Sequence, residues 1–261
     1  MSMFPRGGMF VAWTNAWLDG RASLDEADIH TVAGDAVHRM VGLNHVANPT
    51  GSGGKEEPLA LSIGLSQLRS LGVTSVRLVL PVPGDASGLP GPRTFNEAAI
   101  SAREAVVAQA AVPLGLIPTV ASSGQGVVVR WDVELVDPDR SVPSGRLSEH
   151  ERDLAVALQE TTAAMEGLDL AKDRPDLADR LRLIDREVGQ LVFPPTLSAR
   201  RQRLISTATR LASIIAWASE DDGAAITSAQ AHARTQAFAP MSAAARRSLI
   251  AAYGGRADDD D

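Results

Sequence analysis

The first patterned stretch of the chain is residues 9–18, MFVAWTNAWL. Its larger side chains recur at every second position, which is the period of a β-strand. Ser23 and Glu26 then form a capping box, in which the hydroxyl bonds the Glu26 backbone N–H and the carboxylate reaches back. We therefore predict a strand over 9–18 and a helix from Ser23 to about Asn44. The apolar residues at helical spacing in this helix are Ile29, Val32, Ala33, Ala36, Met40 and Leu43.

The middle of the chain alternates between helical and strand patterns. Leucines at helical spacing over 61–71 stop at Gly72, and β-branched residues dominate 73–80, which predicts a helix followed by a strand. Thr94 and Glu97 indicate a second capping box and a helix to about Gln109. The segments LGLIPTV and GVVVRWDVELV, separated by SSGQG, are typical of an antiparallel hairpin. Residues 46–58 combine Pro, Gly and charge, which predicts a mobile surface loop.

From Ser148 onward almost every segment has helical period, beginning with a capping box of Ser148 and Glu151. Apolar stripes run from Leu177 to Leu191 and from Leu197 to Ala218, and shorter helices are predicted at 224–238 and 241–253. We predict an α+β fold. Residues 1–145 form a mixed or antiparallel sheet of about four strands with flanking helices, and residues 146–261 form a helical bundle or helical layer that shares its core with the first part.

Residues 76–96, VRLVLPVPGDASGLPGPRTFN, lead from a strand-like run into a loop rich in Pro and Gly. Loops built in this way often carry function. The sequence matches neither phosphate-binding glycine motif, and its prolines lack N–H donors, which favours a stiff, shaped turn. Asp85, Arg93 and Asn96 are the candidate ligand-binding residues. We expect Asp85 and Arg93 to pair with each other or with backbone.

Several catalytic chemistries have no support in the sequence. The chain has no cysteine, so thiol nucleophiles, thiolate zinc sites and iron–sulfur clusters are excluded. It has no G-x-S-x-G elbow. His30 and His38 can share a helix face with Asp35, but they lack the four-residue spacing of a helical zinc site. Asp132 and Glu134 share one face of a strand, which is first of all a solvated face. We predict no catalytic residue, no metal site and no cofactor.

Charge is unevenly spread along the chain. The net charge is −7, whereas residues 196–257 carry eight basic and three acidic residues. The basic residues in the helical stripes are Arg200, Arg201, Arg203, Arg210, Arg246 and Arg247. Because the whole chain is acidic and only 4% aromatic, we expect a solvated or internally paired helix face and no nucleic-acid binding.

Apolar runs are too short to span a bilayer, and the N-terminus shows no signal-peptide pattern. We therefore expect a cytoplasmic protein without membrane insertion. The segments VRLVLPVPGD, GLPGPRTFN, ARR (245–247) and AAY (251–253) resemble recurring features of uncharacterised proteins from high-GC actinobacteria. The resemblance covers most of the chain and implies no activity.

Without catalytic motifs, the leading hypothesis is a non-enzymatic binding or scaffolding protein that acts through protein–protein contacts. The alternative is a small-molecule enzyme or ligand-binding protein with its site at the 81–96 loop. Trp217 follows Ile214 and Ile215 near the charged stop at residues 220–222, so it is a candidate interface residue for a protein partner or a homo-oligomer. A core tryptophan is the alternative reading of Trp217.

Overall fold

The computed structural model describes residues 5–32, 34–48, 57–138, 145–167, 177–220 and 228–254. The described residues form two compact units. The sheet unit comprises the described residues from 5 to 138 together with Phe193–Leu197, and the helical unit comprises the remaining described residues from 145 to 254. The fold is α+β, as the sequence predicts. That the two parts share a core stays a prediction.

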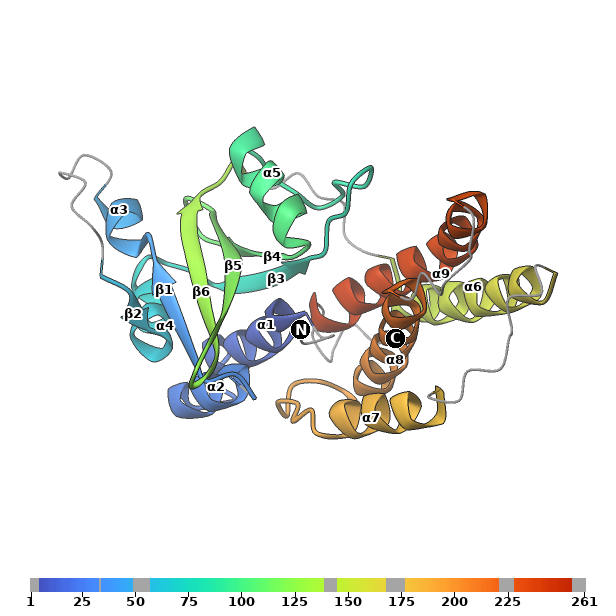
Figure 1. Ribbon diagram of the computed structural model, residues 1–261. Helices are drawn as coiled ribbons and strands as arrows, with labels where there is room; N and C mark the ends of the chain where they lie inside the picture. Colours follow the sequence, from blue (N-terminus) through green and yellow to red (C-terminus); the bar gives the residue numbers. More distant parts are fainter. Residues whose placement is uncertain are drawn as a thin grey trace. The chain divides into compact units, whose positions relative to one another are not determined.

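The sheet unit is built on one mixed sheet, which has six strands among the described residues rather than about four. The strand order is β2-β1-β6-β5-β4-β3 (Figure 1). The β1 and β6 pair is parallel and the other pairs are antiparallel. The strands are β1 (Val37–Val41), β2 (Leu59–Ala60), β3 (Ser75–Val79), β4 (Ala105–Gln109), β5 (Leu114–Ser123) and β6 (Gly126–Leu135). The predicted hairpin of β5 and β6 is confirmed.

One face of the sheet is covered by helices from the first part of the chain, α1 (Arg6–Leu18) and α4 (Leu61–Ser70), with α2 (Leu24–Val32) against both. Phe10 of α1 contacts Trp131 of β6, with ring centroids 4.7 Å apart. Gly64 lets α4 approach Met40 so closely that a Cβ at this position would collide with the methionine side chain. These contacts place one core of the unit on this face of the sheet.

The opposite face carries α5 (Arg93–Ala102). Phe95 is fully buried and lies over Gly115 of β5, where a Cβ would overlap its ring. The cluster on this face consists of Val79, Phe95, Ala99, Ala105, Val107, Ile117 and Val136, with Leu89 packed against it. The loop before α5 is therefore tied into a core through Leu89.

The predicted strand over 9–18 is wrong, because this segment lies within α1. Nearly every residue from Gly7 to Trp17 is buried, so the helix is apolar on almost all sides. A helix that is apolar all round has no polar stripe to set a helical period. Alternation of large and small side chains within it then resembled a strand.

The predicted helix from Ser23 to Asn44 is too long. Its capping box is confirmed, since Glu26 Oε2 accepts the Ser23 N–H at 2.7 Å and Ser23 Oγ accepts the Glu26 N–H at 3.1 Å. However, α2 ends at Val32, and Gly34 has φ +92°, which interrupts the helix before β1 begins. A short helix, α3 (Leu43–Ala47), follows β1. Most of the predicted 46–58 loop, residues 49–56, lies outside the described residues.

The predicted helix to Gln109 is also too long, whereas α4 and β3 are confirmed. The helix α5 begins at Arg93 after the N-cap residue Pro92 and ends at Ala102, before Arg103 at φ +61°. The Thr94–Glu97 capping box does not form, because Glu97 bonds Arg93 instead. Residues 105–109 then form β4, a short apolar run that periodicity does not separate from a helix.

The helical unit contains α6 (Leu147–Gly167), α7 (Leu177–Gly189), α8 (Ala199–Glu220) and α9 (Ser228–Gly254). Both α6 and α8 pack along α9, and α7 packs on α8. The predicted break between 238 and 241 is wrong, since α9 continues through Pro240 with Phe238 and Met241 buried on either side of it. Residues 224–227 of the predicted 224–238 helix lie outside the described residues.

The capping box predicted at Ser148 and Glu151 does not form. The helix α6 begins at Leu147, and Glu149 Oε2 accepts the Arg146 N–H at 3.0 Å. Within the described ranges, none of the helices has both the length and the apolar character that crossing a bilayer requires.

Candidate functional site

The proline- and glycine-rich loop after β3 is built from tight turns. Val82 and Asp85 exchange two backbone hydrogen bonds around Pro83-Gly84, and Asp85 Oδ1 accepts the Ser87 N–H at 3.2 Å. Arg77 of β3 donates from Nη2 to the Gly88 carbonyl at 2.7 Å. Asp85 thus bonds to backbone, which is one of the two outcomes predicted for it.

The other two candidate residues of this loop also make local contacts. Asn96 Oδ1 accepts the Gly91 N–H at 3.1 Å, at a position where Gly91 has φ +100°. Arg93 pairs with Glu97, with Nε and Oε1 2.6 Å apart and the Arg93 side chain 90% exposed. The predicted Asp85–Arg93 pair does not form. These contacts give Asp85 and Asn96 a role in the shape of the loop.

A buried polar network joins the start of α1 to β1. Arg6 donates from Nε and Nη2 to the two carboxylate oxygens of Asp35, at 2.6 and 2.9 Å. Asp35 Oδ2 lies 3.0 Å from His38 Nε2, and Trp131 Nε1 donates to His38 Nδ1 at 3.3 Å. Because an indole nitrogen only donates, His38 Nδ1 must accept, and the ring proton therefore lies on Nε2, facing Asp35.

This network explains two shifted pKa values. Burial raises the pKa of Asp35, but the hydrogen bonds and charges of Arg6 and His38 outweigh it, so the pKa lies below its ordinary value. Burial lowers the pKa of His38, and the Asp35 carboxylate opposes this effect only in part. A neutral His38 donates to Asp35 from Nε2 and accepts from the Trp131 indole at Nδ1, so each of these polar groups has a hydrogen-bond partner. The network therefore has a structural role.

The histidines do not form the shared helix face that their sequence spacing allows. His30 stacks on Trp13 in the α1–α2 layer, with centroids 4.2 Å apart, whereas His38 belongs to β1. Across the parts of the chain that the structure describes, no group of three or more His, Cys, Asp and Glu side chains has the geometry of a metal site.

Two further acidic features lie on the sheet unit. Gly7 donates its N–H to Glu104 Oε1 at 3.4 Å, which places this carboxyl group at the N-terminus of α1. The residue is half-buried as a whole but its carboxyl group is enclosed, and burial raises the pKa of Glu104 to about 7. On β6, Asp132 bonds Thr119 and Arg130, while burial and the Asp132 charge raise the pKa of Glu134.

The arginines at the start of α8 are mostly paired within the helical unit. Arg200 forms a bidentate pair with Glu151 of α6, at 3.0 and 2.8 Å. Arg201 is buried and donates to the carbonyl of Ala251 at 2.8 Å, near the end of α9. Arg210 pairs with Asp185 of α7. The prediction of an internally paired helix face is confirmed for these three residues.

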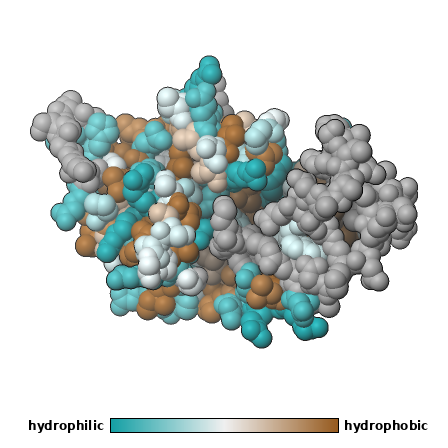
Figure 2. All heavy atoms as spheres, in the orientation of Figure 1, coloured by the Kyte–Doolittle hydropathy of each residue, from teal (hydrophilic) through white to brown (hydrophobic). Residues whose placement is uncertain are grey.

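Figure 2 shows the hydropathy of one face of the molecule. Hydrophobic and hydrophilic residues alternate there in small patches over the described atoms. The exposed apolar side chains of the helical unit include Val156 and Leu158 of α6, with 45% and 40% of their surface exposed.

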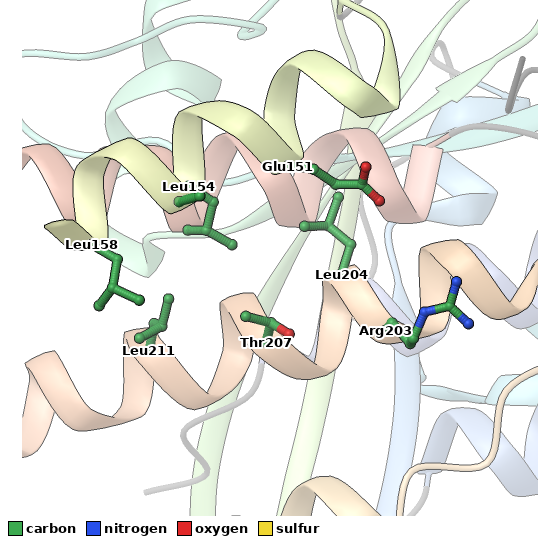
Figure 3. Close-up of a pocket in the computed structure, with 8 residues that line it drawn as sticks. Glu151, Leu154, Leu158, Arg203, Leu204, Thr207 and Leu211 are labelled. Carbon is green, nitrogen blue, oxygen red and sulfur yellow. The ribbon is translucent and has the colours of Figure 1, made fainter.

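An apolar groove of about 250 Å³ lies between α6 and α8. Figure 3 shows Leu154 and Leu158 reaching from α6 toward Leu204 and Leu211 of α8, with Glu151 and Arg203 at one end. The residues that line the groove are Glu151, Leu154, Ala155, Leu158, Arg203, Leu204, Thr207 and Leu211.

The groove exists because of how three helices pack. Both α6 and α8 bury their main apolar stripes against α9 and contact each other little. The Arg200–Glu151 pair joins them at one end. Leu154 and Leu204 are buried, whereas Ala155 and Leu158 of α6 remain open to solvent. The groove is therefore a built feature with a clamped end and an accessible apolar wall.

Sequence reasoning missed this groove. A signal was available in α6, where Glu151, Ala155 and Leu158 form a second stripe beside the one that faces α9. The predicted interface residue Trp217 lies near the end of α8 and is half-buried. Its role as an interface residue stays a prediction.

Fold and groove together define a two-part α+β protein with a helical C-terminal unit that carries an open apolar groove. Family comparisons divide the chain in a similar place. The model for the Rv1486c-like protein N-terminal domain matches residues 8–144, and the model for the Rv1486c-like protein C-terminal domain matches residues 148–250. The chain belongs to this Rv1486c-like family. No curated protein and no solved structure matches it.

Proposed function

We propose that the chain is a non-enzymatic binding protein that acts through protein–protein contacts, with the α6–α8 groove as its docking site. The observation that supports this function is the leucine-lined groove, in which Leu158 stays 40% exposed. Covering apolar surface is favourable by about 25 cal/mol per Å². A partner that fills the groove gains this free energy, and the packing of both α6 and α8 on α9 forms the groove before the partner binds.

The groove has the dimensions of a helix-binding site. Its wall runs from Glu151 to Leu158 on α6 and from Arg203 to Leu211 on α8. At 1.5 Å per residue these walls are about 10–12 Å long, or roughly two helical turns. Two helices that flank a third leave the kind of furrow into which amphipathic helices insert.

The alternative function, a small-molecule enzyme or ligand-binding protein with its site at residues 81–96, has less support. Asp85 and Asn96 use side-chain oxygens to bond the backbone of that loop. We also propose that the protein is cytoplasmic, does not bind nucleic acid and comes from an actinobacterium. An excess of Arg over Lys is typical of the GC-rich coding of such organisms, and the net charge of −7 disfavours nucleic acid.

Affinity purification with three forms of the full chain tests the proposed function. Ala155→Arg combined with Thr207→Arg fills the groove from two exposed positions, and Val156→Arg places a single arginine on an exposed α6 position that does not line the groove. We expect one set of proteins to be retained by the wild type and by Val156→Arg and lost from the double variant. Equal capture by all three forms, with unchanged circular dichroism, contradicts docking in the groove.

A further inference from the structure

Charge is distributed unequally along the α6–α8 groove. Glu151 is neutralised by its bidentate pair with Arg200. Arg203 is exposed, and among the described residues it makes no ion pair. Both Glu151 and Arg203 lie at the same end of the groove (Figure 3). Of the two charged residues that line this end, Arg203 is therefore the one without an ion-pair partner among the described residues.

Helix polarity adds to this charge. Glu151 is four residues from the start of α6 at Leu147, and Arg203 is four residues from the start of α8 at Ala199. The N-terminus of a helix carries a partial positive charge that favours anions. At α6 the Glu149 carboxylate already lies at this terminus, so the α8 N-terminus and the Arg203 guanidinium are the positive groups considered at this end.

Beyond this end the lining is apolar apart from Thr207. The remaining lining residues are Leu154, Ala155, Leu158, Leu204, Thr207 and Leu211, and none of them is charged. Leu154 and Leu158 are one turn apart on α6, and Leu204 and Leu211 are two turns apart on α8. A helix with apolar residues at i, i+4 and i+7 presents side chains at the same spacing.

We infer that the occupant of the groove is an amphipathic helix of a partner protein, about two turns long, with a carboxylate at its C-terminal end that pairs with Arg203. Its negative end lies at the N-termini of α6 and α8, so the bound helix runs antiparallel to both. This inference rests on the proposed function and adds the chemistry and the direction of the partner.

Selection from a display library tests this chemistry without a known partner. The probe is a library of twelve-residue peptides randomised on a helical scaffold, selected against the immobilised full chain. We expect enriched peptides to carry apolar residues at i, i+4 and i+7 and Asp or Glu in the last turn. Their affinity is expected to fall about tenfold, equivalent to 1.4 kcal/mol, with Arg203→Glu.

Swapping the charges of the peptide and of residue 203 tests their contact specifically. Replacing the acidic residue of an enriched peptide by Lys should weaken binding to the wild type and restore binding to Arg203→Glu. The matched control is Arg152→Glu, because Arg152 is exposed on α6 and does not line the groove. We expect this control to change affinity less than twofold.

The outcomes separate the inference from the proposed function. Peptides that lose binding to Ala155→Arg/Thr207→Arg but show no acidic preference, or no response to Arg203→Glu, overturn the inference and leave the function standing. Peptides that bind the double variant unchanged, or no enrichment at all, overturn both. A wild-type dimer in sedimentation equilibrium that the double variant dissociates identifies a second copy as the occupant and overturns the partner helix.

Discussion

Asn15 and Val76 pair with each other as neighbouring strands do. The Asn15 side chain donates from Nδ2 to the Val76 carbonyl at 2.8 Å, and its Oδ1 accepts the Val76 N–H at 2.8 Å. Val76 lies in β3, which is an edge strand of the sheet. Exposed edge strands offer unpaired backbone groups to other chains. The α1 helix thus covers part of this edge through one amide side chain.

We expect Asn15→Leu to destabilise the sheet unit by about 2–4 kcal/mol, because it leaves the N–H and the carbonyl of Val76 without partners. Val76 is only 2% exposed, so water replaces these bonds poorly. Urea unfolding followed by circular dichroism measures the change. Gln125→Ala, in the exposed turn between β5 and β6, is the control and should change stability by less than about 0.5 kcal/mol.

Glu104 gives the sheet unit a defined pH dependence. Its pKa is about 7 in the folded chain, against an ordinary value of 4.5. Between these values the unfolded chain releases a proton that the folded chain keeps. The stability that this proton supplies is therefore fully present below pH 4.5 and is lost as the pH rises through 7.

We expect Glu104→Gln to remove this loss, because glutamine stays neutral and still accepts the Gly7 N–H. The difference in urea midpoint between variant and wild type should grow from pH 5 to pH 8 in favour of the variant. Comparing the two proteins isolates Glu104 from His38, whose lowered pKa makes stability rise with pH in the same range. A difference that stays constant from pH 5 to pH 8 contradicts the assignment.

Trp217 remains our candidate for self-association or partner contact through residues 196–253. It is half-buried near the end of α8, next to buried Ile215. Aromatic residues at such edges commonly anchor interfaces. We expect Trp217→Ala to lower the mean mass in light scattering while the chain stays folded. A wild type that is monomeric at all concentrations, with partner capture unchanged by the substitution, argues against an interface at this position.

Local signals predicted those elements whose ends are marked in the sequence. The β5–β6 hairpin is bounded by a turn at residues 124 and 125, and α4 ends before Gly72 at φ +83°. The sequence did not predict α1 as a helix, because it is buried on nearly all sides. A helix buried in this way has no polar stripe that would show its helical period. The α2 and α5 helices were drawn too long because left-handed residues 34 and 103 end them.

The groove is harder to predict from the sequence than the helices that form it. Periodicity identifies the stripes of α6 and α8 that face α9, but it does not say how far apart these two helices lie. The Arg200–Glu151 pair, 49 residues apart in sequence, bridges the two helices at one end. Loop residues Asp85 and Asn96 drew attention as isolated polar groups, and the structure explains them by bonds to their own loop.

The central claim is that partners dock in the α6–α8 groove rather than at the 81–96 loop. Methyl NMR of the full chain with ¹³C-labelled leucines tests this claim most directly, because Leu154, Leu158, Leu204 and Leu211 line the groove while Leu89 belongs to the loop and packs against the core. Leucine-to-methionine substitutions, one at a time, assign the signals. The probe is the tightest peptide from the display selection.

On titration we predict that the methyl signals of Leu158 and Leu211 shift and broaden in proportion to bound peptide, while those of Leu89 stay in place. The shifts should disappear in Ala155→Arg/Thr207→Arg and persist in Val156→Arg. Shifts confined to Leu89, with Leu158 and Leu211 unchanged at saturation, would contradict docking in the groove and favour a site at the loop.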